Sequence, residues 1–523
     1  MIQKYFAAIS ILFISFSVSA TDYFVSLSGH DGNDGLTTES AWKNIDFALG
    51  SIEPDQGHTL FILPGRYSVY NGLKIPTGIN ITGMADSPAG VVLKASGDNV
   101  YTLLSLKSNL KSSSTKLFVN GNQVVSNITI DGNNICTKGI VSAERNNVKF
   151  KNLIVENCID HGIILAAYEA DHQNKFYVSK IYGAELSNCT VNECARKIPG
   201  SDDLYTSNIV VGGWHGGEMF NCTVFDREGD NESSGQALTH MGMELSKIYN
   251  NHFTINTQIT NHWGGVFSVL SGYSAGVEFY GNTVNSGISC EHRVDEETMQ
   301  LPGIKSLLIY NNRFISDRED GNVPQAIELY PDNIEIYGNY FENFNSCITS
   351  WLGNDTVTNV IIHHNVFRGN GSSTAIKLTM GGGSYNKPEN HTVYQNFRIY
   401  NNVFDNLGSA IRNDHGQAKD FLIKNNVFMN CKDFAWRHDS EEDAINIQFD
   451  TNLFFECDLQ NDNSAQFSNN IENVQPGFNL SGEKPAEYYF PSGETSAVVD
   501  AGTDLVEFTK GYAGSAPDLG AFE

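Results

Sequence analysis

The chain repeats one short phrase, and its clearest copy is Leu308-Ile309-Tyr310-Asn311-Asn312-Arg313-Phe314. Other copies begin at Ile336, Ile362, Ile399 and Ile423. The second Asn of the phrase, or a Cys in its place, falls at positions 152, 189, 222, 251, 282, 312, 339, 365, 402, 426 and 452, so successive marks are 24 to 37 residues apart. A strand-like repeat of this length predicts a solenoid.

Each copy alternates apolar and polar residues, which is the pattern of a strand with one buried face. One copy cannot bury that face alone, but coils stacked about 4.8 Å apart would close a continuous core. The repeated Asn predicts a ladder in which side-chain amides bond to each other and to the turn backbone. Cys189 and Cys222 occupy the ladder position in two early copies, where we expect them to be small buried fillers.

Residues 1–20 have the pattern of a secretory signal peptide, with Lys4, an apolar run and Val18-Ser19-Ala20 as the cleavage site. The sequence therefore predicts secretion, to the periplasm or beyond the cell. We expect residues 21–523 to form a single domain. Its predicted parts are an N-terminal cap with the first coils (21–125), the regular coils (126–460) and a closing segment (461–523).

The formal net charge of −27 argues against nucleic acid and anionic membranes as partners. No apolar run after the signal peptide is long enough to span a bilayer. We expect a monomer. Nine cysteines are an odd number, and a chain of this length needs no disulfide framework.

The first part of the mature chain holds a predicted capping helix, in which Trp42, Ile45, Leu49 and Ile52 are spaced for one face and Ser40 is a plausible N-cap. A helix here would cover the open edge of the first coil. Before it lies a turn, 29–35, rich in oxygen ligands. Its Asp31 and Asp34 are candidate Ca²⁺ ligands, and the alternative is that they only shape a polar turn. The sequence predicts no other cofactor.

Several segments together resemble the secreted right-handed parallel β-helix proteins of the pectate-lyase-like superfamily. The opening segments are 23–35, 41–45 and 62–67, and the closing ones are 496–502 and 516–523. The resemblance implies an all-β fold, a right-handed parallel β-helix of about 11–13 coils with an N-terminal capping helix. The superfamily includes polysaccharide lyases, glycoside hydrolases, epimerases, esterases and non-catalytic adhesins, and a shared fold does not choose among them.

A second strand follows each phrase, and in the C-terminal half its copies align. Ile327, Ile348, Ile376 and Ile411 share one parity and should point inward. The outward columns then read Glu328, Thr349, Lys377, Arg412 and Tyr330, Trp351, Thr379, Asp414, with His415 just beyond. The segment 434–439 continues the sheet in an uncertain register, so that either Trp436 or Arg437 faces outward, and His292 and Arg293 lie on an earlier coil, also in uncertain register.

Long segments flank these strands and predict walls of a groove that would suit an extended polymer; they are 196–205, 226–236, 293–303, 317–324 and 380–396. Trp351 offers an apolar surface for sugar rings. Lys377, Arg412 and Arg437 indicate an anionic ligand, carboxylated or sulfated. Candidate substrate-binding residues are Trp351, Thr349, His292, Arg293, Arg437 and His438.

The first hypothesis is β-elimination on a uronate-containing polysaccharide. It assigns Lys377 as the base, Arg412 as the group that neutralises the carboxylate, and His415 or Tyr330 as the acid. A Lys followed one coil later by Arg412-Asn413-Asp414-His415-Gly416 is similar to the Lys and Arg-His-Gly arrangement of chondroitinase-B-like and alginate lyases. Here the arrangement is two residues longer, and that family's acidic calcium motif is not evident.

The second hypothesis is hydrolysis of a neutral or sulfated glycan by two carboxylates, as in β-helical fucanases, carrageenases and polygalacturonases. Glu328 and Asp414 are its candidates, with Glu291 or Asp439 as alternatives. Glu328 and Asp414 should lie three rungs apart, roughly 14 Å by the rung spacing, so a loop acid such as Asp317 or Glu319 could be needed. A third hypothesis is a non-catalytic glycan-binding β-helix.

Overall fold

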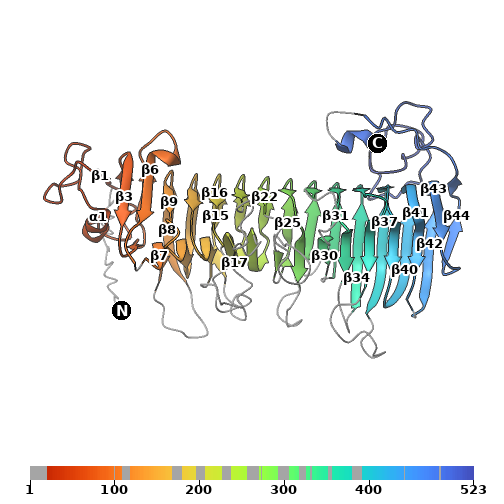
Figure 1. Ribbon diagram of the computed structural model, residues 1–523, viewed down its shortest axis with the longest axis horizontal. Coiled ribbons are helices and arrows are strands. Elements are labelled where there is room, and N and C mark those ends of the chain that lie inside the picture. The colour runs from red at the N-terminus through yellow and green to blue at the C-terminus, as the bar shows by residue number, and fades with distance from the viewer. Residues whose placement is uncertain are drawn as a thin grey trace, which may run out of the picture.

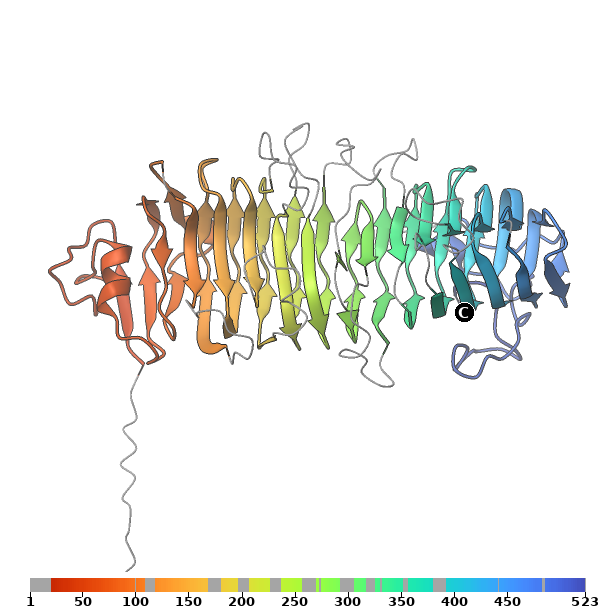
Figure 2. The same ribbon diagram turned by 90° about the horizontal axis from the view of Figure 1, so that it is seen from below.

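The computed structural model shows a right-handed parallel β-helix, which confirms the predicted fold class (Figures 1 and 2). It describes residues 20–98, 100–108, 118–167, 180–195, 207–225, 237–255, 270–271, 274–291, 305–316, 325–329, 332–350, 356–379, 392–440, 442–481 and 485–522. Every strand pairs in parallel with strands of the neighbouring coils, so that three ladders run the length of the molecule. Residues 1–19 of the predicted signal peptide (1–20) lie outside the described residues. Among those described, no helix has both the length and the hydropathy that crossing a bilayer demands.

The first ladder holds the strands that precede the repeated Asn. They are β1 (Asp22–Val25), β2 (Thr59–Ile62), β5 (Asn80–Gly83), β8 (Val119–Ser126), β11 (Arg145–Lys151), β15 (Glu185–Ser187), β18 (Glu218–Phe220), β21 (Lys247–Tyr249), β25 (Val277–Tyr280), β28 (Leu307–Tyr310), β31 (Ile334–Tyr337), β34 (Thr356–His363), β37 (Val393–Tyr400), β40 (Gln417–Lys424), β42 (Ala444–Asp450) and β44 (Ala465–Ser468).

The second ladder holds the short strands that follow the Asn. They are β3 (Gly65–Val69), β6 (Val91–Ala95), β9 (Thr129–Asp131), β12 (Ile154–Glu156), β16 (Thr190–Asn192), β19 (Thr223–Phe225), β22 (His252–Thr254), β26 (Thr283–Val284), β29 (Arg313–Ile315), β32 (Tyr340–Glu342), β35 (Val366–Arg368), β38 (Val403–Asp405), β41 (Val427–His438), β43 (Leu453–Gln460) and β45 (Ile471–Glu472).

The third ladder closes each coil and carries the predicted site. Its N-terminal part is β4 (Leu73–Lys74), β7 (Thr102–Lys107), β10 (Lys138–Ala143), β13 (His161–Ala166), β17 (Ile209–His215), β20 (Leu238–Glu244) and β24 (Ser274–Ala275), with β14 (Ile181–Tyr182) beside β17. Its C-terminal part is β23 (Leu270–Ser271), β27 (Ile288–Glu291), β30 (Gln325–Leu329), β33 (Ser346–Ser350), β36 (Thr374–Leu378) and β39 (Ser409–Asn413). Strand β39 pairs with the end of β41.

The repeated Asn form the predicted ladder inside the coil. Asn365 shows the pattern: its side-chain amide donates to the backbone oxygen of Ile336 and to Oδ1 of Asn402 on the next coil, each at 2.9 to 3.0 Å. The same contacts link positions 251, 282, 312, 339, 365, 402, 426, 452 and 470. Cys189 and Cys222 are buried fillers, as predicted, and all nine cysteines are free thiols. Asn152 does not belong to the ladder, because it is an exposed turn residue with positive φ and the buried ladder position is Leu153.

Apolar columns fill the rest of the interior. The phenyl rings of Phe314, Phe341, Phe367, Phe404, Phe428 and Phe454 stack along the axis with centroids 4.7 to 5.0 Å apart. Stacking at this spacing follows from the strand separation, because equivalent side chains repeat once per rung. The core is therefore continuous from one end of the solenoid to the other.

Helix α1 (Ile45–Ser51) covers the first coil, as the spacing of Ile45 and Leu49 predicts (Figure 1). The predicted N-cap is wrong, since Asn44 takes that position and the Ser40 hydroxyl instead donates to Asp34. Asp34 also accepts from the backbone N–H of Leu36, and these two bonds lower its pKa. Asp31 accepts from the backbone N–H groups of Lys43 and Asn44. Both carboxylates thus stabilise the turn, which supports the polar-turn alternative.

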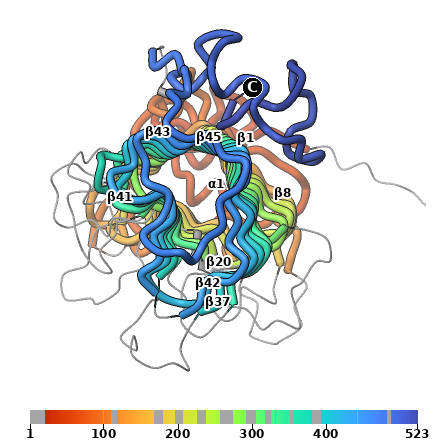
Figure 3. Tube along the Cα trace, turned by 90° about the vertical axis from the view of Figure 1, so that its right-hand side faces the viewer, coloured from red at the N-terminus to blue at the C-terminus, as the bar shows by residue number. Residues whose placement is uncertain are grey.

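The segment after the last coil packs along the outside of the second ladder. Phe478, Tyr489 and Leu519 lie in one buried cluster with Val403 and Val427, and Figure 3 shows this segment beside β43 and β45. The described part of the chain also contains two short 3₁₀ helices, η1 (Pro88–Gly90) and η4 (Pro485–Tyr489). The first ladder has 16 strands, so the predicted 11–13 coils is too low. The first coils carry no ladder Asn, and a count based on that residue misses them.

Candidate functional site

The outer face of the third ladder brings the predicted cations into one column. Lys377 on β36 pairs in register with Arg412 on β39, and Arg412 pairs with Arg437 on β41. The isoleucines one residue earlier, at 327, 348, 376 and 411, are buried at 0 to 1% exposure. The three cationic side chains are 29%, 32% and 31% exposed, so all three turn toward the same open face.

The uncertain register at the end of this face is resolved by β41. Trp436 pairs with Ile411 and is fully buried, and its indole N–H donates to Ser464 at 2.8 Å. Arg437 therefore faces outward. The preceding part of β41 shifts its register against β43 between Cys431 and Phe434. Between these two residues β41 has two residues more than β43, so the regular alternation is interrupted there. This is why the alternation alone left two alternatives.

Each cation of the column is paired with a carboxylate. Asp414 contacts both Lys377, at 3.6 Å, and the Nε of Arg412. Asp439 contacts the guanidinium groups of Arg412, at 3.3 Å, and Arg437, at 2.7 Å. Asp433 adds a second contact to Arg437 at 3.2 Å. We name these residues the charged face: Lys377, Arg412, Arg437, Asp414, Asp433 and Asp439.

The pairing corrects the prediction of a basic cluster. Three cations meet three carboxylates, so the local charge is balanced. Asp414 and Asp439 sit two positions after the arginines, just beyond the ends of the strands, and Asp433 lies within β41, four positions before Arg437. The hydrogen bond and the charge of Asp439 raise the pKa of Arg437. An anionic ligand would have to exchange with Asp414 or Asp439 at the guanidinium groups.

The other described candidates lie around the charged face. His415 is exposed beyond Asp414, with its Nδ1 at 3.5 Å from the Thr379 hydroxyl. His438 lies parallel to the Trp436 ring and its Nδ1 is 3.3 Å from the amide of Asn413. Thr349 is one rung before Lys377. Its side chain is buried, and its hydroxyl has no partner among the described residues.

The carboxylate pair of the hydrolase hypothesis is separated as predicted. Glu328 pairs with Thr349, which pairs with Lys377, which pairs with Arg412. Three rungs amount to roughly 14 Å. The candidates Tyr330, Trp351, His292 and Arg293 lie outside the described residues, as do Asp317, Glu319 and most of the predicted groove walls. In the part of the chain that is described, no group of three His, Cys, Asp or Glu side chains could hold a metal ion.

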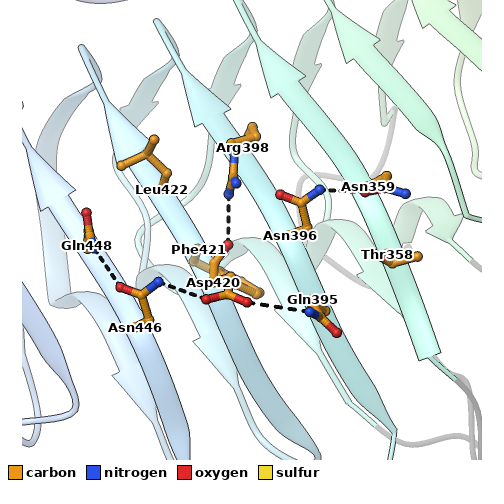
Figure 4. Close-up of a pocket in the computed structure, with 10 residues that line it drawn as sticks. All are labelled: Thr358, Asn359, Gln395, Asn396, Arg398, Asp420, Phe421, Leu422, Asn446 and Gln448. Carbon is orange, nitrogen blue, oxygen red and sulfur yellow. Dashed lines mark hydrogen bonds between the residues drawn. The ribbon is translucent and has the colours of Figure 1, made fainter.

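A hollow on the first ladder was missed by the sequence reasoning. It measures about 360 Å³ and is lined by Thr358, Asn359, Gln395, Asn396, Arg398, Asp420, Phe421, Leu422, Asn446 and Gln448 (Figure 4). Strands β34, β37, β40 and β42 each bend at one residue with a φ of 57° or 58°, and these residues lie in register. They are Asn359, Asn396, Asp420 and Asn446. The recurring Asn or Asp inside these strands was the available signal, because such residues tolerate left-handed backbone.

Comparison with known proteins extends to fold alone. No family model and no curated protein matches the sequence. Similar solved structures include "Geobacillus virus E2 – ORF18", with 14% identity and a TM-score of 0.31. The match covers 68% of this chain and 57% of that structure's chain. A mannuronic-acid-specific family 6 polysaccharide lyase from human gut microbiota has 13% identity and a TM-score of 0.41. This match covers 75% of this chain and 84% of the lyase chain. A mutant tailspike protein of E. coli bacteriophage HK620, in complex with a hexasaccharide, has 12% identity and a TM-score of 0.48. This match covers 84% of this chain and 76% of the tailspike chain. Identities this low carry no activity over to this chain.

Proposed function

We propose that the protein is an exported enzyme that cleaves an anionic polysaccharide by β-elimination at the charged face. The observation that carries the proposal is the register of Lys377 and Arg412 on successive rungs. Both side chains are about one-third exposed on the same flat face. A base and a guanidinium on adjacent rungs are the pair that removal of a proton beside a carboxylate requires.

The roles follow from the geometry of the face. Arg412 binds the uronate carboxylate in exchange for one of its aspartates, and it stabilises the negative charge that develops as the C5–H bond breaks. Lys377, as the neutral amine, accepts that proton. The C4–O bond then breaks with formation of the C4=C5 double bond, and His415 donates a proton to the leaving oxygen. Asp414 contacts both cations and positions them. Lys377 must lose a proton to solvent before it can act as the base.

A hydrolase is the second candidate, favoured by the placement of Asp414 and Asp439. The backbone N–H of Asp439 donates to the oxygen of Asn413, and both carboxylates contact Arg412, so they belong to successive rungs. One rung is about 4.8 Å, close to the roughly 5–5.5 Å that separates the carboxyl groups of retaining glycosidases. Glu328 and Asp414 are too far apart for either geometry.

The experiment separates the candidates by their products. The mature protein, 21–523, is incubated with alginate, pectate, chondroitin, dermatan, fucoidan and carrageenan. Absorbance near 232 nm and reducing ends are followed together. β-Elimination raises both signals, because each cleavage forms an unsaturated uronate and one reducing end. Reducing ends without absorbance would replace the lyase by the hydrolase, and neither signal on any polymer would leave the non-catalytic glycan-binding alternative.

A further inference from the structure

The hollow on the first ladder offers the chemistry that recognises a sugar. Its lining combines the amides of Gln395, Asn396 and Asn446 with the carboxylate of Asp420. Amides both donate and accept, and the carboxylate accepts, so together they match hydroxyl groups, which do both. Leu422, partly exposed, adds an apolar surface for ring C–H groups.

The polar groups are held in place by each other. Asn446 donates to Asp420 at 2.8 Å, Gln448 donates to Asn446 at 2.6 Å, and Asn396 donates to Asn359 (Figure 4). Side chains fixed in this way lose little conformational entropy when a ligand binds. Because the bend residues repeat on four successive coils, the hollow extends along the axis of the solenoid, the direction in which a polymer would lie.

Arg398 is the cation of this hollow, and its surroundings differ from those of the charged face. One of its nitrogens donates to the backbone oxygens of Asp420 and Phe397, at 2.8 and 3.1 Å. Its in-register neighbours on the adjacent coils are Ile361 and Leu422, both apolar. Within the described residues, no carboxylate lies at ion-pair distance from its guanidinium.

Earlier coils show what that column does elsewhere. The same column of the first ladder carries Lys149 paired with Glu185 at 3.0 Å, and Lys247 paired with Glu278 at 3.3 Å. There the cation meets its own carboxylate on the next rung. At Arg398 that position is aliphatic, so the next rung supplies no carboxylate to its guanidinium.

We infer that this hollow is a binding site for an acidic sugar residue of a glycan. Arg398 takes the carboxylate or sulfate, and Asn396, Asp420 and Asn446 take hydroxyl groups. The site lies on a different ladder from the charged face, so it would hold a polymer without taking part in its cleavage. The inference uses none of the chemistry proposed for Lys377.

Calorimetry and hydrogen exchange test it on the mature chain carrying Lys377→Ala, so that no probe is turned over. The probes are hexagalacturonate, a sulfated maltohexaose and unmodified maltohexaose. We expect an anionic probe to protect amides of β37 and β40, residues 393–400 and 417–424, and to bind at least tenfold more tightly than maltohexaose. Comparison of the two anionic probes shows which acidic group the site prefers. Arg398→Ala should weaken that binding about tenfold or more, as loss of a charge-assisted hydrogen bond implies.

Two further variants separate recognition from folding. Arg398→Lys keeps the charge and should retain part of the affinity, whereas Arg313→Ala, at an exposed arginine on β29, should change nothing. Unprotected amides at 393–400 and 417–424 with both anionic probes, equal binding of maltohexaose, or unchanged affinity in Arg398→Ala would overturn the inference. Arg398-dependent binding without any cleavage of polymers would instead remove only the proposed activity, and cleavage without protection at 393–400 and 417–424 would remove only this site.

Discussion

The charged face and the hollow are two polar surfaces built on neighbouring ladders of the same coils, yet their cations are in different situations. On the charged face Lys377, Arg412 and Arg437 each contact an aspartate of the chain. In the hollow Arg398 lies between Ile361 and Leu422 on the adjacent rungs. The difference teaches that a cation in an outward column is not by itself an anion site. The residue on the next rung decides whether the cation forms an ion pair within the protein or can bind a ligand.

The largest effect should come from the charged face. Lys377→Ala removes the proposed base and should lower kcat on the substrate found in the polymer panel by about 10² to 10⁴-fold. Lys424→Ala is the matched control, since Lys424 is also paired with an aspartate, Asp450 at 2.7 Å, on another ladder. Initial rates at 232 nm measure both. Full turnover in Lys377→Ala would remove the assigned base and leave the charged face a structural network.

The sequence predicted this face because strand parity is a local property. Alternation alone placed Ile376 inside and Lys377 outside, and the common phase of the Asn copies placed Arg412 one rung later. The partners were harder to foresee. Asp414 and Asp439 act from turns after the strands. The pairing of β41 with β39, beyond an irregular stretch of β41, decides that Arg437 and not Trp436 faces outward. Turn geometry and irregular pairing depend on neighbouring coils, which no single repeat reveals.

The next effect concerns the ladder of Asn side chains inside the coils, which supports both surfaces. Asn402→Ala removes the hydrogen bond that its amide donates to the backbone oxygen of Ile362, and it leaves the N–H of Asn365 without its buried acceptor. Unsatisfied buried groups of this kind should lower the free energy of unfolding by about 2 to 4 kcal/mol. Urea denaturation measures the loss, with Asn120→Ala at an exposed amide as control. Equal stability of the two variants would show that the ladder is a turn signal and not a source of stability.

A third change makes the charged face resemble the hollow. Asp439→Asn removes the charge shared by Arg412 and Arg437 and should tighten binding of hexagalacturonate about tenfold, since the ligand no longer competes with that carboxylate. Calorimetry measures the affinity, and Asp443→Asn, an exposed neighbour, is the control. Weaker binding would show that Asp439 itself contacts the sugar. Loss of reducing-end formation with the binding intact would favour the hydrolase, in which Asp439 is one of the two carboxylates.

The hollow was beyond the sequence reasoning for a physical reason. Its shape comes from one residue with left-handed backbone inside each of four strands. The sequence alone does not reveal the φ angle that an Asn or Asp in a strand adopts. The equivalent position on an earlier coil is Gly183, with a φ of 65°. Gly, Asn and Asp at one phase share only the ability to adopt positive φ, and that common property appears once the strands are in register.

The smallest effect tests whether this backbone angle forms the hollow. Asn396 has a φ of 58°, where Ala is disfavoured by roughly 1 to 2 kcal/mol and Gly is not. Asn396→Ala should therefore lower the free energy of unfolding by about 1 kcal/mol, and Asn396→Gly by less, although both lose the same bond to Asn359. Gln395→Ala, one residue earlier and without a positive φ, is the control for loss of an amide. If Ala and Gly at 396 prove equally stable in urea, the side chain and not the bend sets the cost, and the shape of the hollow must be assigned to the Asn359–Asn396 contact instead.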